Sequence, residues 1–309
     1  MFCDHRIGGA ERWYLQRAED YMVIPDDIRK CVGFIGYQKP DGTVLFAGTV
    51  FFVARKMDTI PDRAFVYAVT ARHVIDSIRG KGINMVLLRL NRKTSDAVWV
   101  RTRVQDWISN SSDASVDVAV TRFNLDEPLA HKVIPLEASA TSHIIQEHKI
   151  DVGDEVFLSG LFAPHVGRKN NIPIVRVGNI AAMLHEKVST SIGEIDAYLI
   201  EARSIGGLSG SPVFVNATGV RHGVLRITDA PQLFLLGLMH GHFDSEFFPL
   251  DSFADASGKA GINMGIGIVV PVEKIIEVIN QPAFRDPEKA TEDQLRKQNP
   301  PKTDVGAGG

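Results

Sequence analysis

The chain has 309 residues, of which 44% are hydrophobic and 23% charged, so it has the length and composition of a globular protein with one large or two modest cores. Its 34 basic and 37 acidic residues give a net charge of -3 and are scattered, which argues against a nucleic-acid partner. No apolar run approaches the ~20 residues of a membrane helix, and the first residues lack the apolar core of a secretory signal. With only two cysteines, Cys3 and Cys31, we expect a cytoplasmic protein with no disulfide framework and no membrane partner.

Most of the chain alternates with a period of two, which indicates short strands. A first set of six runs is rich in Val, Ile and aromatic residues and covers 31–37, 44–54, 64–70, 85–90, 98–104 and 116–123. A second set of six covers 155–161, 173–181, 194–201, 211–215, 233–239 and 264–270, after a stretch at 137–148 that suits a short helix. This pattern predicts an all-β fold of two packed six-stranded antiparallel barrels.

The two ends of the chain differ from this pattern. Apolar spacing over 10–22 predicts a helix within an N-terminal extension at 1–29, and Pro271 introduces a predicted C-terminal helix at 272–280. We place the first barrel at 30–136, the connection at 137–152, and the second barrel with its helix at 153–282. The charged, Pro-rich and Gly-rich composition of 283–309 predicts a mobile tail.

Three motifs carry chemistry. Ser209 lies between glycines in Gly207-Leu208-Ser209-Gly210-Ser211-Pro212, at the start of an apolar run. A serine hydroxyl needs a base and an orienting carboxylate to act as a nucleophile. His73 follows the apolar run at 64–70, at the end of the segment Thr70-Ala71-Arg72-His73. Asp117 lies in an alternating run that predicts a strand. The chain order His73, Asp117, Ser209 is the order of one of the three well-known serine-hydrolase architectures, the chymotrypsin type.

These three motifs resemble the signature blocks of the trypsin-like, chymotrypsin-fold serine peptidases, above all the bacterial branch without disulfides. The resemblance extends over about residues 30–280. It implies a serine endopeptidase that cuts a protein or peptide substrate through an acyl-enzyme intermediate and needs no cofactor. Ser209 would be the nucleophile, His73 the general base and Asp117 the orienting acid, and the backbone N–H groups of Gly207 and Ser209 would form the oxyanion hole.

The same resemblance gives an expectation for specificity. The residue six positions before the nucleophile, Arg203, would lie at the base of the substrate pocket, and a wall would come from Met239, His240 and Gly241. Since trypsins carry an acid where Arg203 stands, we expect cleavage after apolar or acidic residues and not after Lys or Arg.

Several alternatives stay open at this point. The same fold could serve as a catalytically silent module that binds a peptide or protein, or as an esterase or acyl transferase that uses Ser209. An α/β-hydrolase is disfavoured because the strands do not alternate with helices and the base precedes the serine. Asp113, in a Ser/Asn-rich loop, is an alternative acid, although a turn role fits it better. His240 and His242 form a potential pair on one strand face, but no third ligand is near in sequence, so we expect no metal.

Overall fold

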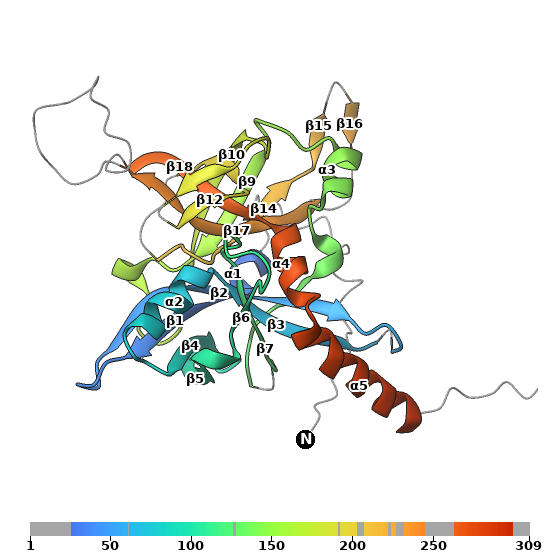
Figure 1. The fold of residues 1–309 in the computed structure, drawn as a ribbon. Coiled ribbons are helices and arrows are strands. Elements are labelled where there is room, and N and C mark those ends of the chain that lie inside the picture. The colour runs from blue at the N-terminus through green and yellow to red at the C-terminus, as the bar shows by residue number, and fades with distance from the viewer. Residues whose placement is uncertain are drawn as a thin grey trace, which may run out of the picture.

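The computed structural model describes residues 26–60, 62–125, 128–190, 192–202, 207–221, 224–226, 232–244 and 263–298. The helix expected at 10–22 and the pocket residue Arg203 lie outside these ranges. The described chain forms two β regions, with α4 and α5 along one side (Figure 1). The prediction of an all-β fold with a helix after the last strand is confirmed.

The first β region is one eight-stranded sheet that follows the six predicted runs closely. Its path is β5-β4-β1-β2-β3-β7-β6, all antiparallel, with β8 parallel to β2. The strands are β1 (Val32–Gln38), β2 (Val44–Lys56), β3 (Ala64–Thr70), β4 (Met85–Asn91), β5 (Ala97–Arg103), β6 (Ile108–Ser109), β7 (Ala119–Arg122) and β8 (Ile134–Pro135). It differs from the prediction in closure: among the described residues β5 and β6 end the path without pairing to each other.

The second β region is the closed barrel that the sequence predicts, in the order β10-β13-β18-β17-β14-β9. Its strands are β9 (Glu155–Gly160), β10 (Ile174–Ala182), β13 (Tyr198–Glu201), β14 (Pro212–Asn216), β17 (Leu233–Asp244) and β18 (Asn263–Pro271). Two small hairpins add β11 (Val188–Thr190) with β12 (Gly193–Ile195), and β15 (Gly219–Arg221) with β16 (Val224–Arg226).

Both β regions share one hydrophobic core. The larger cluster of buried side chains joins strands of the first sheet to Phe157, Phe214 and Leu238 of the barrel. A smaller cluster fills the barrel itself and includes Leu208 and Met239. Because apolar side chains from both regions bury one another, the junction between them is closely packed and can hold a site in fixed geometry.

Five α-helices accompany the sheets in the described ranges, and two of them differ from expectation. The helices are α1 (Asp27–Lys30), α2 (Arg72–Gly80), α3 (Ser142–His148), α4 (Val272–Ile279) and α5 (Pro282–Gln298). α3 and α4 fall where helices are predicted. α2 was not predicted, although its buried Val74, Ile75 and Ile78 have helical spacing.

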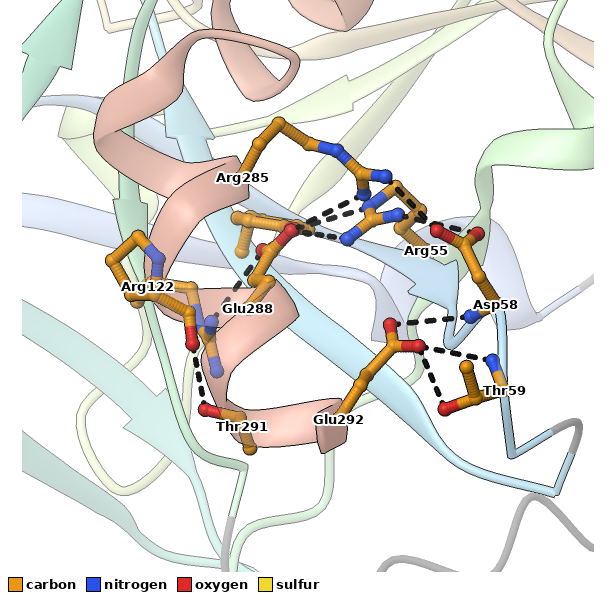
Figure 2. Close-up of polar contacts among 10 residues, drawn as sticks. Arg55, Asp58, Thr59, Arg122, Arg285, Glu288, Thr291 and Glu292 are labelled. Atoms are coloured by element: carbon orange, nitrogen blue, oxygen red, sulfur yellow. Dashed lines mark hydrogen bonds and ion pairs between the residues drawn. The ribbon is translucent and has the colours of Figure 1, made fainter. Parts of the chain in front are cut away.

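α5 corrects the prediction of a mobile tail at 283–309. Its residues up to Gln298 form a helix that buries Phe284, Glu288 and Glu292 against the first sheet. Figure 2 shows Glu288 between the guanidinium groups of Arg55, Arg122 and Arg285, and Glu292 beside the chain at 58–59. Composition misses this helix because its stability comes from specific buried partners and not from an apolar face.

Candidate active site

The predicted base and acid are in direct contact. His73 lies in the first turn of α2, because β3 ends at Thr70, so the expectation that it ends a strand is corrected. Its Nδ1 is 2.8 Å from Oδ2 of Asp117, and its backbone N–H donates to Oδ1 of the same carboxylate at 2.9 Å. Asp117, two residues before β7, is fully buried, while 31% of the His73 side chain is exposed. Two bonds to one residue fix both the position and the rotation of the imidazole.

A second imidazole holds the same carboxylate. Nδ1 of His240, in β17, is 2.5 Å from Oδ2 of Asp117, and the His73 and His240 rings meet edge to face at 5.2 Å. The pairing of β17 with β18 slips between Met239 and Gly241, which makes His240 the bulged residue. A bulge re-aims a side chain, and here it accompanies the approach of His240 to Asp117.

Three N–H groups therefore point at one buried carboxylate. Burial by itself would raise the pKa of Asp117, but the hydrogen bonds from His240 and His73 outweigh it and hold that pKa well below its usual range. Asp117 is thus a permanent anion at the floor of the site. It keeps Nδ1 of His73 protonated and leaves Nε2 as the basic nitrogen.

The turn that carries Ser209 is built by backbone geometry. Gly207 and Gly210 have φ values of 104° and 83°, in the region that favours glycine. A Cβ at position 210 would lie 2.3 Å from Oγ1 of Thr70 and 2.4 Å from the carbonyl oxygen of Thr49, so only glycine fits there. Among the described residues, the backbone N–H groups of Gly207 and Ser209 have no hydrogen-bond acceptor.

The hydroxyl of Ser209 points at a carbonyl in this structure. Its Oγ donates to the carbonyl oxygen of His240 at 3.1 Å, and within the described part of the chain no hydrogen bond joins it to His73. The side chain is partly exposed. Catalytic hydrogen bonds are often loose or misaligned without substrate, and a turn of the Ser209 side chain changes this partner.

Thr49 links the two β regions at the site, although nothing in its sequence context singles it out. The residue is fully buried in β2. Its backbone N–H donates to the Ser209 carbonyl at 2.9 Å, and its Oγ1 donates to the Gly207 carbonyl at 2.9 Å. The same Oγ1 accepts the N–H of Leu161 at 2.9 Å. In the sequence Thr49 is part of the apolar run at 44–54, which predicts a strand and assigns no role to this residue.

The residues predicted to bind substrate have different outcomes. The Met239 side chain is fully buried in the barrel core, and the substrate contact expected of this residue stays a prediction. His240 holds Asp117 through Nδ1, and Gly241 is partly exposed beside it. Asp113 accepts the N–H and the hydroxyl of Ser115, which is the turn role expected of it.

One group of described residues has the donor atoms of a metal site. The ligand atoms of His73, Asp117 and His240 all lie within 4.8 Å of one another. The bulge at His240 interrupts the strand alternation that suggested a His240–His242 pair. No helix in the described ranges is both long and apolar enough to span a membrane.

No family model and no curated protein matches the chain. Among solved structures, it is similar to the MamO protease domain from Magnetospirillum magneticum, at 12% identity and a TM-score of 0.46, over 83% of this chain and 99% of that one. It is also similar to an inactive serine-to-alanine mutant of Rv3671c from M. tuberculosis H37Rv, at 16% identity and a TM-score of 0.43, over 86% and 96% of the chains. The Drosophila Grass clip serine protease of the Toll pathway matches at 13% identity and a TM-score of 0.45, over 91% and 75%.

Proposed function

We propose that the protein is a serine endopeptidase that uses Ser209, His73 and Asp117. The observation that carries this proposal is the pair of hydrogen bonds from His73 to the buried carboxylate of Asp117, whose pKa is held well below its usual range. A purely structural histidine does not need its Nδ1 held by a buried carboxylate while its ring stays partly exposed to solvent. A general base needs both.

The chemical steps follow from these positions. Ser209 Oγ turns from the His240 carbonyl to Nε2 of His73 and attacks the substrate carbonyl carbon while Nε2 takes its proton. The oxyanion forms where the unpaired N–H groups of Gly207 and Ser209 can donate to it. His73 then gives the proton to the leaving amine. In the second half of the reaction water attacks the acyl-enzyme, His73 takes a proton from that water, and the same proton returns to Ser209 as the serine leaves. Asp117 stabilises the imidazolium at each step.

A catalytically silent binding module is the second candidate, because the Ser209 hydroxyl is bonded to a backbone carbonyl and not to His73. Labelling with a fluorophosphonate, with the modified residue located by mass spectrometry, distinguishes the two. The endopeptidase reacts at Ser209, and the Ser209→Ala variant does not react and loses hydrolysis by on the order of 10⁵- to 10⁶-fold. A wild-type chain that folds but never reacts favours the binding module.

The substrate class needs its own test. Profiling with a peptide library and with simple esters separates an endopeptidase from an esterase or acyl transferase on the same serine. We propose cleavage after apolar or acidic residues, as expected from Arg203, and dominant cleavage after Lys or Arg would contradict it.

A further inference from the structure

The floor of the candidate site is unusual because two imidazoles converge on one carboxylate oxygen. Oδ2 of Asp117 is 2.8 Å from Nδ1 of His73 and 2.5 Å from Nδ1 of His240. Two imidazole nitrogens and one carboxylate oxygen form a ligand set that Zn²⁺ and Co²⁺ accept, and catalytic zinc sites often combine three such ligands with an open fourth position. A serine nucleophile with its base and acid does not require the second histidine.

We propose that His73, Asp117 and His240 bind a divalent transition-metal ion, with Zn²⁺ the best fit, and that this ion reversibly blocks the serine chemistry. The inhibition rests on the proposed function, whereas the binding itself does not. The site differs from the His240–His242 pair that the sequence suggested, since its other two ligands come from the first β region.

The geometry needs little adjustment to take an ion. Ligand atoms ~2.1 Å from a tetrahedral ion lie about 3.4 Å apart. Each Nδ1 would therefore move away from Oδ2 by less than about 1 Å, and a pair of ligand atoms at the 4.8 Å limit would close by about 1.4 Å. Side-chain rotation of His73 and a small shift of His240 supply these movements. The partly exposed His73 gives an ion access from solvent, while Asp117 and His240, at 0% and 8% exposure, form a buried wall. The carboxylate offsets one of the two positive charges.

The proton balance explains why the ion would stop catalysis. In the metal-free site each neutral ring carries its proton on Nδ1 and donates it to Asp117. To bind the ion through the Nδ1 lone pair, each ring loses that proton and takes one from solvent at Nε2, so the total number of bound protons does not change. Nε2 of His73 then carries a hydrogen and cannot accept the proton of Ser209. Metal binding and general-base catalysis are therefore mutually exclusive.

Binding is tested on tag-free Ser209→Ala protein, which retains all three ligands but cannot react. Titration with Co²⁺ should give one equivalent of a complex with the visible absorption of a four-coordinate ion, which Zn²⁺ displaces. Ser209→Ala also excludes an ion held between His73 and the serine hydroxyl, because that mode needs Ser209.

The ligand set is tested with two matched variants in the same background. His240→Asn keeps an N–H donor toward Asp117 but removes the imidazole, and we expect metal affinity to fall by more than about 100-fold, since loss of an outer-shell partner alone costs 10–100-fold. His242→Gln, two residues along the same strand, should bind as the parent does. Equal Co²⁺ binding by His240→Asn overturns the site. If His240→Asn does not fold, as judged by circular dichroism and melting, His73→Gln replaces it, with the same outcomes.

Inhibition is tested on the wild-type chain by fluorophosphonate labelling. Zn²⁺ should suppress labelling of Ser209, and a chelator should restore it. Labelling that persists at Zn²⁺ concentrations that saturate the cobalt-displacement curve overturns the inhibitory role. A chain that binds Co²⁺ through His240 but never reacts with the probe would retain the metal site and remove the proposed peptidase function.

Discussion

The two β regions contribute to the candidate site in different ways. The first β region supplies the base and acid, and hydrogen bonds to the Asp117 carboxylate fix them: two come from His73 and a third from His240 of the barrel. The barrel supplies the nucleophile, and it fixes Ser209 by backbone geometry, through two glycines with positive φ and carbonyl contacts to Thr49. The positions of the base and the acid therefore depend on particular side chains, whereas the position of the nucleophile depends on the path of the backbone.

The difference also extends to how each region is braced. The described side-chain contacts of α5 outside its own helix go to the first β region, through Arg55 in β2, Tyr67 in β3, Arg122 in β7 and the connection at 58–59. β3 and β7 are the strands next to His73 and Asp117. Among its described contacts the nucleophile turn has no packed helix of this kind, and its reference point in the first sheet is Thr49. Changes at the acid, at Thr49 and at α5 should thus have decreasing effects on activity.

Loss of the charge on Asp117 should have the largest effect of these changes. In Asp117→Asn an amide replaces the carboxylate, so His73 can adopt the tautomer with its proton on Nε2. In that tautomer Nε2 cannot accept the proton of Ser209. We expect kcat to fall by about 10⁴-fold with the fold retained, as loss of a triad acid does in related chemistry. Steady-state kinetics with an ester or peptide substrate, together with circular dichroism, measures this.

Asp113→Asn is the matched control for that substitution. Asp113 is four residues away and bonds only within its own turn in the described contacts, to Ser115. We expect its kcat to stay within about twofold of wild type, since surface substitutions of this kind cost little. If Asp117→Asn kept full activity while Asp113→Asn lost it, the assignment of the acid would be wrong.

Removal of the Thr49 hydroxyl should have an intermediate effect. Thr49→Val keeps the shape of the side chain but leaves the Gly207 carbonyl and the Leu161 N–H without their shared partner. An unpaired buried polar group costs ~1–3 kcal/mol, so the turn should shift relative to the first sheet. We expect kcat to fall by roughly 10- to 100-fold, with KM changed less, because a misplacement of about 1 Å affects the reacting atoms most.

Thr49→Ser provides the rescue for this prediction. Serine keeps the hydroxyl that donates to Gly207 and accepts from Leu161, and loses only a methyl group in the core. Activity close to wild type in Thr49→Ser, with a deficit in Thr49→Val, would assign the effect to the hydroxyl. Equal deficits in both variants would show that packing and not hydrogen bonding positions the turn.

The sequence predicts the parts of the fold that depend on local pattern. Alternation and turn residues locate the twelve predicted strands within a few residues, and the residues of two of the three motifs, His73 and Asp117, lie in contact. What it misses depends on contacts between distant residues. The bulge that turns His240 toward Asp117 is a matter of register with β18. Likewise the sequence shows Thr49 only as a residue of a predicted strand. Its role depends on the contact with the turn of Ser209, which only the structure shows.

α5 shows the same limit in a charged segment. Its sequence is polar, and polar composition alone favours a mobile tail. The helix docks because Glu288, only 1% exposed, meets Arg55, Arg122, Arg285 and the Tyr67 hydroxyl, and because Glu292 accepts the N–H groups of Asp58 and Thr59. Those partners lie more than 160 residues earlier in the chain, apart from Arg285. No local pattern indicates that they meet.

Breaking this brace should affect stability more than activity. Glu288→Ala leaves the Arg55 guanidinium and the Tyr67 hydroxyl without their buried acceptor, and removing one partner of such a network costs about 3–5 kcal/mol. The free energy of unfolding should fall by about 3 kcal/mol, measured by urea denaturation, while kcat at low temperature falls by less than about tenfold.

Asp293→Asn removes an acidic charge from an exposed position of the same helix and should leave the unfolding midpoint unchanged. If the two variants unfold alike, α5 does not brace the first sheet. If Glu288→Ala instead loses activity as completely as Asp117→Asn, the base–acid pair depends on α5 for its geometry and not only on its own three hydrogen bonds.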